Sequence, residues 1–138
     1  MNGIKLNLRL MFRPKKVLVV DDSSLSRKIA RQHLEGLGYE VAEAPDGMLA
    51  LEEYAIEQQD LVILDLLMSG MTGLEVLKVL KQMNPSLPVI VVSADIQHAT
   101  RTEVREAGAI GLLNKPLNKD MLAELLETIA QGRTGWTD

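Results

Sequence analysis

The sequence predicts an α/β fold, a doubly wound parallel sheet of five strands with helices on both faces. Five short aliphatic runs alternate with five segments in which apolar residues recur at helical spacing. The connections between them are short, as expected for parallel strands joined by right-handed helical crossovers. The length of 138 residues suits a single domain with its own core.

The first three strands are expected at residues 17–20, 39–44 and 61–64. The first and third are continuously aliphatic, which is typical of strands buried on both faces, whereas the second is more polar and suits a sheet edge. Ser23 or Ser24 can cap the helix between the first two strands. The turn at residues 45–47 leads into a second helix.

The second half of the chain continues the alternation. A loop at residues 70–73 precedes a third helix, which Asn84 and Pro85 stop. The segment 132–138 is expected to be frayed. The remaining elements are strands at residues 88–93 and 110–113 and helices at residues 99–107 and 117–129.

Composition and charge narrow the class of protein. Hydrophobic residues make up 46% of the chain and charged residues 25%, which is ordinary for a globular domain. The net charge of −4 disfavours nonspecific binding to nucleic acid or acidic membranes. No apolar run approaches the roughly 20 residues of a membrane helix, and no signal-peptide segment follows the first basic residues. Because cysteine is absent, disulfides and thiolate metal sites are excluded, and we expect a cytoplasmic protein.

Residues 1–14 precede the predicted domain, which begins at Lys15. Apolar and polar residues alternate between Ile4 and Leu10 with the period of a β-strand. One interpretation is an extension that packs on its own domain or reflects a misassigned start. The other is an extra strand that pairs with an exposed sheet edge, for instance in a homodimer formed through residues 1–12.

Polar side chains follow four of the five predicted strands at the same edge of the sheet. These side chains are Asp21 and Asp22 after the first strand, Asp65 after the third, Ser93 at the fourth and Lys115 after the fifth. Ligands of parallel α/β sheets bind outside these carboxyl ends. Each residue alone has an ordinary explanation as a turn or helix-terminal residue, but chance poorly explains all of them at one edge. We therefore expect a functional site there.

Three clustered carboxylates repel one another and raise one another's proton affinity unless a cation lies among them. A hard divalent ion that retains several waters, Mg²⁺, fits such a site. With the metal bound, Asp65 is a candidate nucleophile whose attack on phosphorus would give an aspartyl phosphate. Ser93 and Lys115 would then hold the phosphoryl oxygens.

In order and spacing, these motifs resemble the receiver domain of two-component response regulators. The resemblance covers roughly residues 15–131 and implies a flavodoxin-like sheet of strand order 2-1-3-4-5 with five helices. The matching residues are Val17-Leu18-Val19-Val20-Asp21-Asp22, Leu64-Asp65-Leu66-Leu67-Met68 with Gly73 eight residues beyond Asp65, Val92-Ser93-Ala94 and Lys115-Pro116.

The resemblance also assigns a role to each residue of the site. It implies that Asp65 is the phosphoacceptor, that Ser93 is the switch hydroxyl and that Lys115 pairs with the phosphate. The Mg²⁺ ligands that it implies are Asp21, Asp22, Asp65 and the backbone carbonyl of Leu67. It further implies a cis peptide bond before Pro116.

By resemblance, the function is signalling and not enzymatic turnover. A histidine kinase or phosphotransfer protein would donate the phosphoryl group. The surface formed by the segments 99–107, 110–113 and 117–129 would then change for a downstream protein or a phosphatase, and it is a second candidate face for homodimerisation. Because only seven residues follow residue 131, we expect a stand-alone receiver without a nucleic-acid-binding domain.

Three positions differ from the pattern of the family. Ser69 stands where a proline usually follows the methionine of the phosphoacceptor loop, which predicts a less rigid loop. Leu112 stands where the fifth strand usually carries a switching tyrosine or phenylalanine, so rotation of that ring cannot be the output. Asp95 places a carboxylate near the expected phosphoryl site, where it could orient or repel an attacking water.

Three rival functions remain to be weighed. Ser69 and Leu112 motivate a degenerate receiver that acts as a phosphorylation-independent binding module, although every acid, hydroxyl and lysine position of the site is intact. A phosphatase of the haloacid-dehalogenase type would need an aspartate two residues after the nucleophile, where this chain has Leu67. A flavodoxin-like nucleotide-binding protein would need a glycine-rich loop after the first strand, where two aspartates would repel phosphate.

Overall fold

The structure, a computed structural model, describes residues 15–137. The extension or extra strand predicted for residues 1–14, and with it the homodimer through residues 1–12, lies outside the described residues. Strands and helices alternate along the chain as predicted. They are β1 (Lys16–Val20), α2 (Ser24–Gly36), β2 (Glu40–Ala44), α3 (Gly47–Glu57), β3 (Leu61–Asp65), α4 (Gly73–Met83), β4 (Val89–Ser93), α5 (His98–Glu106), β5 (Gly111–Asn114) and α6 (Lys119–Ala130).

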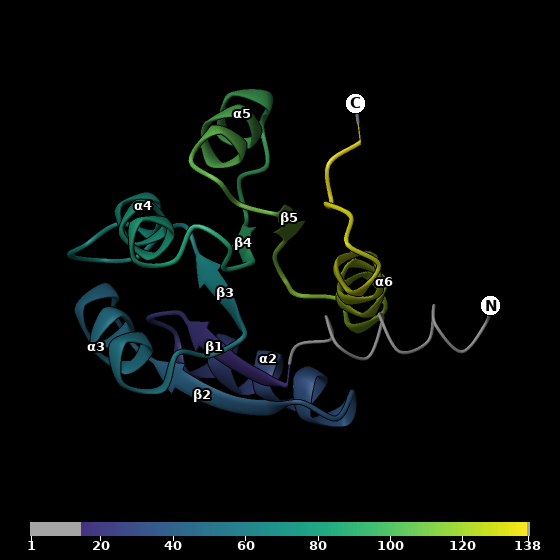
Figure 1. Cartoon of the computed structure of the whole chain (residues 1–138), viewed down its shortest axis with the longest axis horizontal. Coiled ribbons are helices and arrows are strands. Elements are labelled where there is room, and N and C mark those ends of the chain that lie inside the picture. Colours follow the sequence, from purple (N-terminus) through teal and green to yellow (C-terminus); the bar gives the residue numbers. More distant parts are fainter. Residues whose placement is uncertain (1–14, 138) are drawn as a thin grey trace.

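The five strands form one parallel sheet of order β2-β1-β3-β4-β5, which confirms the predicted flavodoxin-like topology. Helices α3, α4 and α5 cover one face of the sheet, and α2 and α6 cover the other (Figure 1). The register places Val20 beside Leu64 and Asp65 beside Val92. The carboxyl ends of neighbouring strands therefore lie level, at one edge of the sheet.

Side-chain alternation along the strands divides the core into two layers. In β1, Leu18 and Val20 pack with the layer under α3, α4 and α5, whereas Val17 and Val19 pack with the layer under α2 and α6. Every residue of β3 and β4 is buried, as the continuous aliphatic runs predicted. Asp65 and Ser93, at the carboxyl ends of these two strands, thus stand on backbone that is buried throughout.

Side-chain caps fix where most of the helices begin. The Ser23 hydroxyl accepts a hydrogen bond from the Ser26 amide, so Ser23 is the cap of α2. Thr72 and Glu75 form a reciprocal capping box at α4. Helix α5 differs, because its cap residue makes no side-chain hydrogen bond and Val104 is the one residue of the helix that is buried. Helix α5 is therefore held less firmly than its neighbours.

The expectation that the segment after α6 is frayed is wrong for residues 132–137. The Gly135 amide donates to the Ile110 carbonyl at 2.7 Å, and the Trp136 indole donates to the Ala109 carbonyl at 2.8 Å. The indole also packs on the core layer beneath α5. These contacts span more than 20 residues of sequence, so no local pattern could predict them. Of the described helices, none is long and apolar enough to cross a membrane.

Candidate functional site

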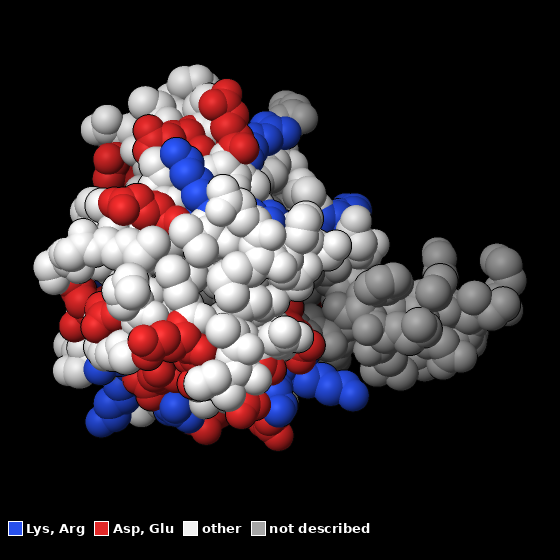
Figure 2. All heavy atoms as spheres, turned by 60° about the vertical axis from the view of Figure 1, so that its left-hand side comes forward, with Lys and Arg blue, Asp and Glu red and all other residues white. Residues whose placement is uncertain are grey.

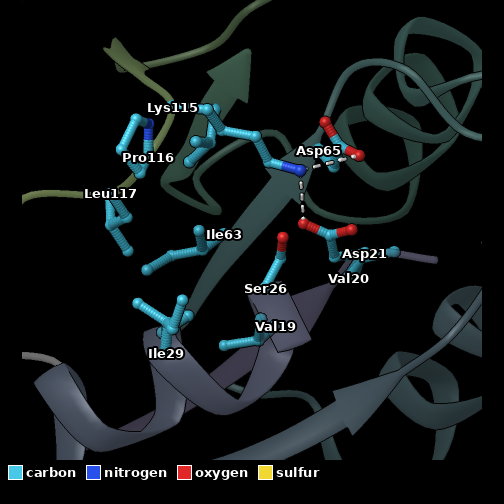
Figure 3. A pocket seen from close by; sticks show the side chains of 12 residues that line it. Val19, Val20, Asp21, Ser26, Ile29, Ile63, Asp65, Lys115, Pro116 and Leu117 are labelled. Atoms are coloured by element: carbon cyan, nitrogen blue, oxygen red, sulfur yellow. Dashed lines mark ion pairs between the residues drawn. The ribbon is translucent and has the colours of Figure 1, made fainter. Parts of the chain in front are cut away.

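The predicted carboxylates meet at the carboxyl ends of β1 and β3. Asp21, Asp22 and Asp65 each offer an oxygen, and these oxygens lie within 4.8 Å of one another. Lys115, directly after β5, places its ammonium 2.8 Å from Asp21 Oδ2 and 3.3 Å from Asp65 Oδ2. Figure 3 shows this amine reaching between the two carboxylates. Four of the predicted side chains therefore form one cluster.

Backbone amides orient the acidic side chains. Asp21 Oδ1 accepts the Ser23 amide at 2.9 Å, which joins the acid to the start of α2. Asp65 Oδ1 accepts the Leu67 amide, and Asp22 Oδ2 accepts the Ser69 amide, both at 3.3 Å. Asp21 and Asp65 are buried and Asp22 is exposed. The cluster thus opens to solvent on the side of Asp22.

The loop after β3 needs glycine at position 73. The Gly73 amide donates to the Leu66 carbonyl at 3.1 Å, which draws the start of α4 onto the end of β3. A Cβ atom at this position would lie 2.3 Å from the Asp65 carbonyl oxygen and 2.6 Å from Leu66 Cα. Only a residue without a side chain permits this approach. Gly73 therefore positions the backbone that carries Asp65.

The pKa values of Asp65 and Lys115 are both raised, for different physical reasons. Burial raises the pKa of Asp65, the nearby Asp21 carboxylate raises it further, and Lys115 only partly offsets both effects. Burial alone would lower the pKa of Lys115, but its hydrogen bonds and attraction to Asp21 and Asp65 outweigh burial and raise it. Lys115 therefore stays charged at neutral pH. Its single positive charge does not fully compensate the negative charge of the Asp65 carboxylate.

Ser93 ends β4 and is completely buried. Its hydroxyl oxygen accepts the Asp95 amide at 3.0 Å, and its carbonyl accepts the Lys115 amide at 3.0 Å. The Asp95 carboxylate accepts the Gln97 amide at 3.1 Å and the Thr100 hydroxyl at 3.2 Å. Its oxygens are thus engaged at the start of α5. The peptide bond between Lys115 and Pro116 is cis, as the resemblance implied.

A small cavity of about 50 Å³ lies beside the cluster. Asp21, Asp65 and Lys115 line one part of it, and Ile29 and Leu117 belong to its apolar wall (Figure 3). The cavity therefore combines charged groups with an apolar surface. Such a space can shield a small anionic group from water on one side.

Sequence reasoning missed the contribution of Arg27. Its guanidinium donates to the Asp21 carbonyl at 2.7 Å and to Glu43 Oε1 at 3.1 Å. Arg31 donates to the other Glu43 oxygen, and these bonds hold the pKa of Glu43 below its usual range. The residues come from α2 and β2, so only the folded pairing of β1 with β2 brings them together. A charged residue on an amphipathic helix gives no sequence signal for this role.

The model of the response regulator receiver domain matches residues 17–127 of this chain. The chain therefore belongs to the response regulator receiver domain family, whose members act in two-component signalling. The chemotaxis protein CheY of Thermotoga maritima is 34% identical over 118 residues, which is 85% of this chain and 98% of that protein. The transcriptional regulatory protein ZraR of Klebsiella oxytoca is 41% identical over 118 residues, and this chain spans 27% of its length.

Solved structures give the same result. The chemotaxis protein CheY4 of Vibrio cholerae superposes with a TM-score of 0.80 at 32% identity, over 84% of this chain and 98% of that one. CheY in the CheX-CheY-BeF3-Mg²⁺ complex of Borrelia burgdorferi gives 0.77 at 28% identity, over 80% of this chain and 85% of that one. The predicted family and fold are thereby confirmed.

Receiver domains bind Mg²⁺ at an acidic pocket, and the residues present fit such an ion. The donors are carboxylate oxygens, the hard ligands that Mg²⁺ prefers. Two of the three carboxylates are buried, and Lys115 supplies only one positive charge against them. A divalent cation would relieve the excess negative charge.

Proposed function

We propose that this receiver accepts a phosphoryl group on Asp65 from a phosphohistidine, carried by a histidine kinase or a phosphotransfer protein. The observation that carries the proposal is the convergence of Asp21, Asp22, Asp65 and Lys115 on one edge of the sheet. A structural ion pair does not need a third carboxylate beside the two that pair with the Lys115 amine. The proposed site includes Ser93, and the domain acts as a phosphoacceptor in the cytoplasm and not as an enzyme that turns over a substrate.

In the proposed step, an oxygen of the Asp65 carboxylate attacks phosphorus. An O–P bond forms and the P–N bond to the imidazole breaks, so its electron pair returns to the histidine nitrogen, which then takes up a proton. The Lys115 ammonium, 3.3 Å from Asp65, would pair with a phosphoryl oxygen. The Ser93 hydroxyl would turn from the Asp95 amide to donate to another.

Asp21, Asp22, Asp65 and the Leu67 carbonyl are the proposed ligands of Mg²⁺. When bound, the ion offsets negative charge on the carboxylates and the incoming phosphoryl oxygens. Leu67 follows β3 in an exposed loop, and its amide donates to Asp65 Oδ1, so its backbone lies beside the acidic cluster. The role of the protein residues is to hold these oxygens at one place before the donor arrives.

We further propose that output passes through protein contacts at the surface of α5, β5 and α6, which we call the output surface. The complex of CheX with CheY in Borrelia burgdorferi supports a protein partner, and a phosphatase is one candidate. This chain covers 98% of Thermotoga maritima CheY, which supports the proposal of a stand-alone receiver. Homodimerisation is a second proposed kind of contact through the output surface. Basic side chains lie among acidic ones on the face drawn in Figure 2, which gives no support to nucleic-acid binding.

Intact-mass analysis tests the proposal. The full chain is incubated with Mg²⁺ and either acetyl phosphate or a phosphorylated histidine kinase. We expect one phosphoryl adduct on the wild type and on the control Glu57→Gln, whose side chain pairs with Lys16 away from the cluster, and none on Asp65→Asn. Absence of an adduct with both donors would refute the proposal and favour the degenerate receiver that Ser69 and Leu112 motivate.

A further inference from the structure

Trp136 is the single tryptophan of the chain, and it is anchored on the output surface. Its indole nitrogen donates to the Ala109 carbonyl at 2.8 Å, in the turn between α5 and β5. The guanidinium carbons of Arg101 and Arg105, both on α5, lie 5.7 and 5.6 Å from the centroid of the ring. Both distances fall within the range of cation–π attraction. Three kinds of contact thus hold one half-buried side chain.

Close backbone contact holds the residue before it. The Gly135 amide donates to Ile110, and a Cβ atom on Gly135 would lie 2.5 Å from a Leu125 methyl carbon and 3.3 Å from Gly111 Cα. A glycine at each of these two positions lets the segment lie directly on β5, the edge strand of the sheet. In Figure 1 the segment, in yellow, leaves α6 and runs toward the level of α5.

The segment nevertheless leaves space beneath it. A groove of about 670 Å³ lies between residues 132–137, β5 and α6. Arg133, Thr134 and Thr137 are exposed. The Arg133 amide donates to the Thr128 carbonyl of α6 at 3.1 Å, and beyond that point the segment is held mainly by Gly135 and Trp136. A segment with few anchors over an open groove can be displaced without unfolding the core.

Trp136 also supplies an aromatic ring where the strand lacks one. Leu112 and Trp136 both pack against the core layer beneath α3, α4 and α5, on the same face of β5. The strand offers only the aliphatic Leu112 at the position where the family pattern has an aromatic residue. The ring on this surface therefore comes from the segment after α6.

We propose that residues 133–137 are an intramolecular ligand of the output surface, and that phosphorylation of Asp65 releases Trp136 from it. The release rests on the proposed function of Asp65. A downstream partner then binds the surface that the indole covered. A partner segment with an exposed aromatic side chain matches the vacated position, because the Arg101 guanidinium and the Ala109 carbonyl contact an aromatic side chain there in the present structure.

A continuous set of contacts joins the two sites. The Ser93 hydroxyl holds the Asp95 amide, and Asp95 holds Gln97 and Thr100 at the start of α5. When Ser93 turns to a phosphoryl oxygen, this loop loses its anchor and the start of α5 moves. Arg101 lies in the first turn of that helix and Arg105 one turn further. Because α5 buries only Val104, its movement shifts both guanidinium groups relative to the ring.

Fluorescence of the single tryptophan tests the release in the full chain. Acrylamide quenching is measured with Mg²⁺, before and after beryllofluoride, while intact mass after acetyl phosphate reports phosphorylation separately. We expect the quenching constant of the wild type to rise by about twofold or more as a half-buried indole becomes accessible, and that of Asp65→Asn to stay constant. Gly135→Ala should raise quenching without beryllofluoride, whereas the exposed neighbour Thr137→Ala should not.

The outcomes separate the two proposals. A phosphoryl adduct without a change in quenching would overturn the release and leave the phosphoacceptor function intact. Absence of an adduct would remove the phosphoacceptor function, and the release with it. Low quenching in Gly135→Ala, equal to that in Thr137→Ala, would show that the observed contacts do not seat the indole.

Discussion

Replacing Asp65 by asparagine should stabilise the domain when Mg²⁺ is absent. The raised pKa of Asp65 means that the folded protein binds its proton more tightly than the unfolded chain does. Stability is therefore lost as the pH rises from the usual value of a carboxyl through the raised folded value, and at neutral pH the charged carboxylate is a net cost. Asparagine removes the charge and keeps an oxygen that can accept the Leu67 amide.

The magnitude follows from the distances in the cluster. With an effective dielectric constant of about 20, charges on Asp21 and Asp65 within 4.8 Å repel by at least about 3.5 kcal/mol, and Lys115 at 3.3 Å attracts Asp65 by about 5 kcal/mol. The attraction to Lys115 therefore exceeds the repulsion from Asp21. Burial of Asp65, which is 5% exposed, costs the charged carboxylate a few kcal/mol and outweighs this net attraction. We expect Asp65→Asn to gain about 1 kcal/mol, or about 4 °C in melting temperature.

Thermal unfolding followed by circular dichroism measures the melting temperatures of the wild type and Asp65→Asn at neutral pH, first with a chelator and then with Mg²⁺. At about ten times its dissociation constant, Mg²⁺ should stabilise the wild type by about 1.4 kcal/mol and the variant by much less. Glu57→Gln is the control, because Glu57 pairs with Lys16 at the amino-terminal end of β1, away from the acidic cluster. This variant should keep the full stabilisation by Mg²⁺. A wild type that does not respond to Mg²⁺, or a variant less stable than the wild type under chelation, would refute the reasoning.

Three further predictions concern the scaffold. Glu43→Gln should lose about 0.5 kcal/mol at neutral pH, and urea titrations should show the loss shrinking as the pH falls through the lowered pKa that Arg31 produces. Gly73→Ala should lose about 1–3 kcal/mol and, if Asp65 accepts the phosphoryl group as proposed, slow phosphorylation in time-resolved mass measurements, since its methyl would lie 2.3 Å from the Asp65 carbonyl oxygen. Leu122→Ala should lose about 2–5 kcal/mol in denaturant unfolding, whereas its exposed neighbour Met121→Ala should lose little.

The fold and the core of the site could be predicted because both depend on local patterns. Buried parallel strands have continuous aliphatic sequences, and four of the five strands are followed or ended by a polar residue at a fixed place. Asp21, Asp22, Asp65 and Lys115 could therefore be assigned to one edge before any distance was known, and the structure brings them together. For Asp65 the expected rise in pKa was right in direction, although burial contributes more to it than repulsion from Asp21.

Contacts between distant segments could not be predicted. Arg27 reaches the Asp21 carbonyl only because α2 lies beside β1. Its partner Glu43 lies on β2, the strand that pairs with β1. Trp136 looked like part of a frayed end because its neighbours are small and polar. Its seat is formed by Ala109, Arg101 and Arg105, about 30 residues earlier in the chain.

The weak attachment of α5 has a consequence for how the family can diversify. Val104 is the buried residue of this helix, whereas α4 buries four residues and α6 five. Most positions of α5 can therefore be substituted with little effect on the free energy of folding. Selection for a new partner can then act on α5 while the acidic cluster and Lys115, which stand at the ends of β1, β3 and β5, stay fixed. Duplicated genes could acquire separate signalling partners through a few changes in one helix.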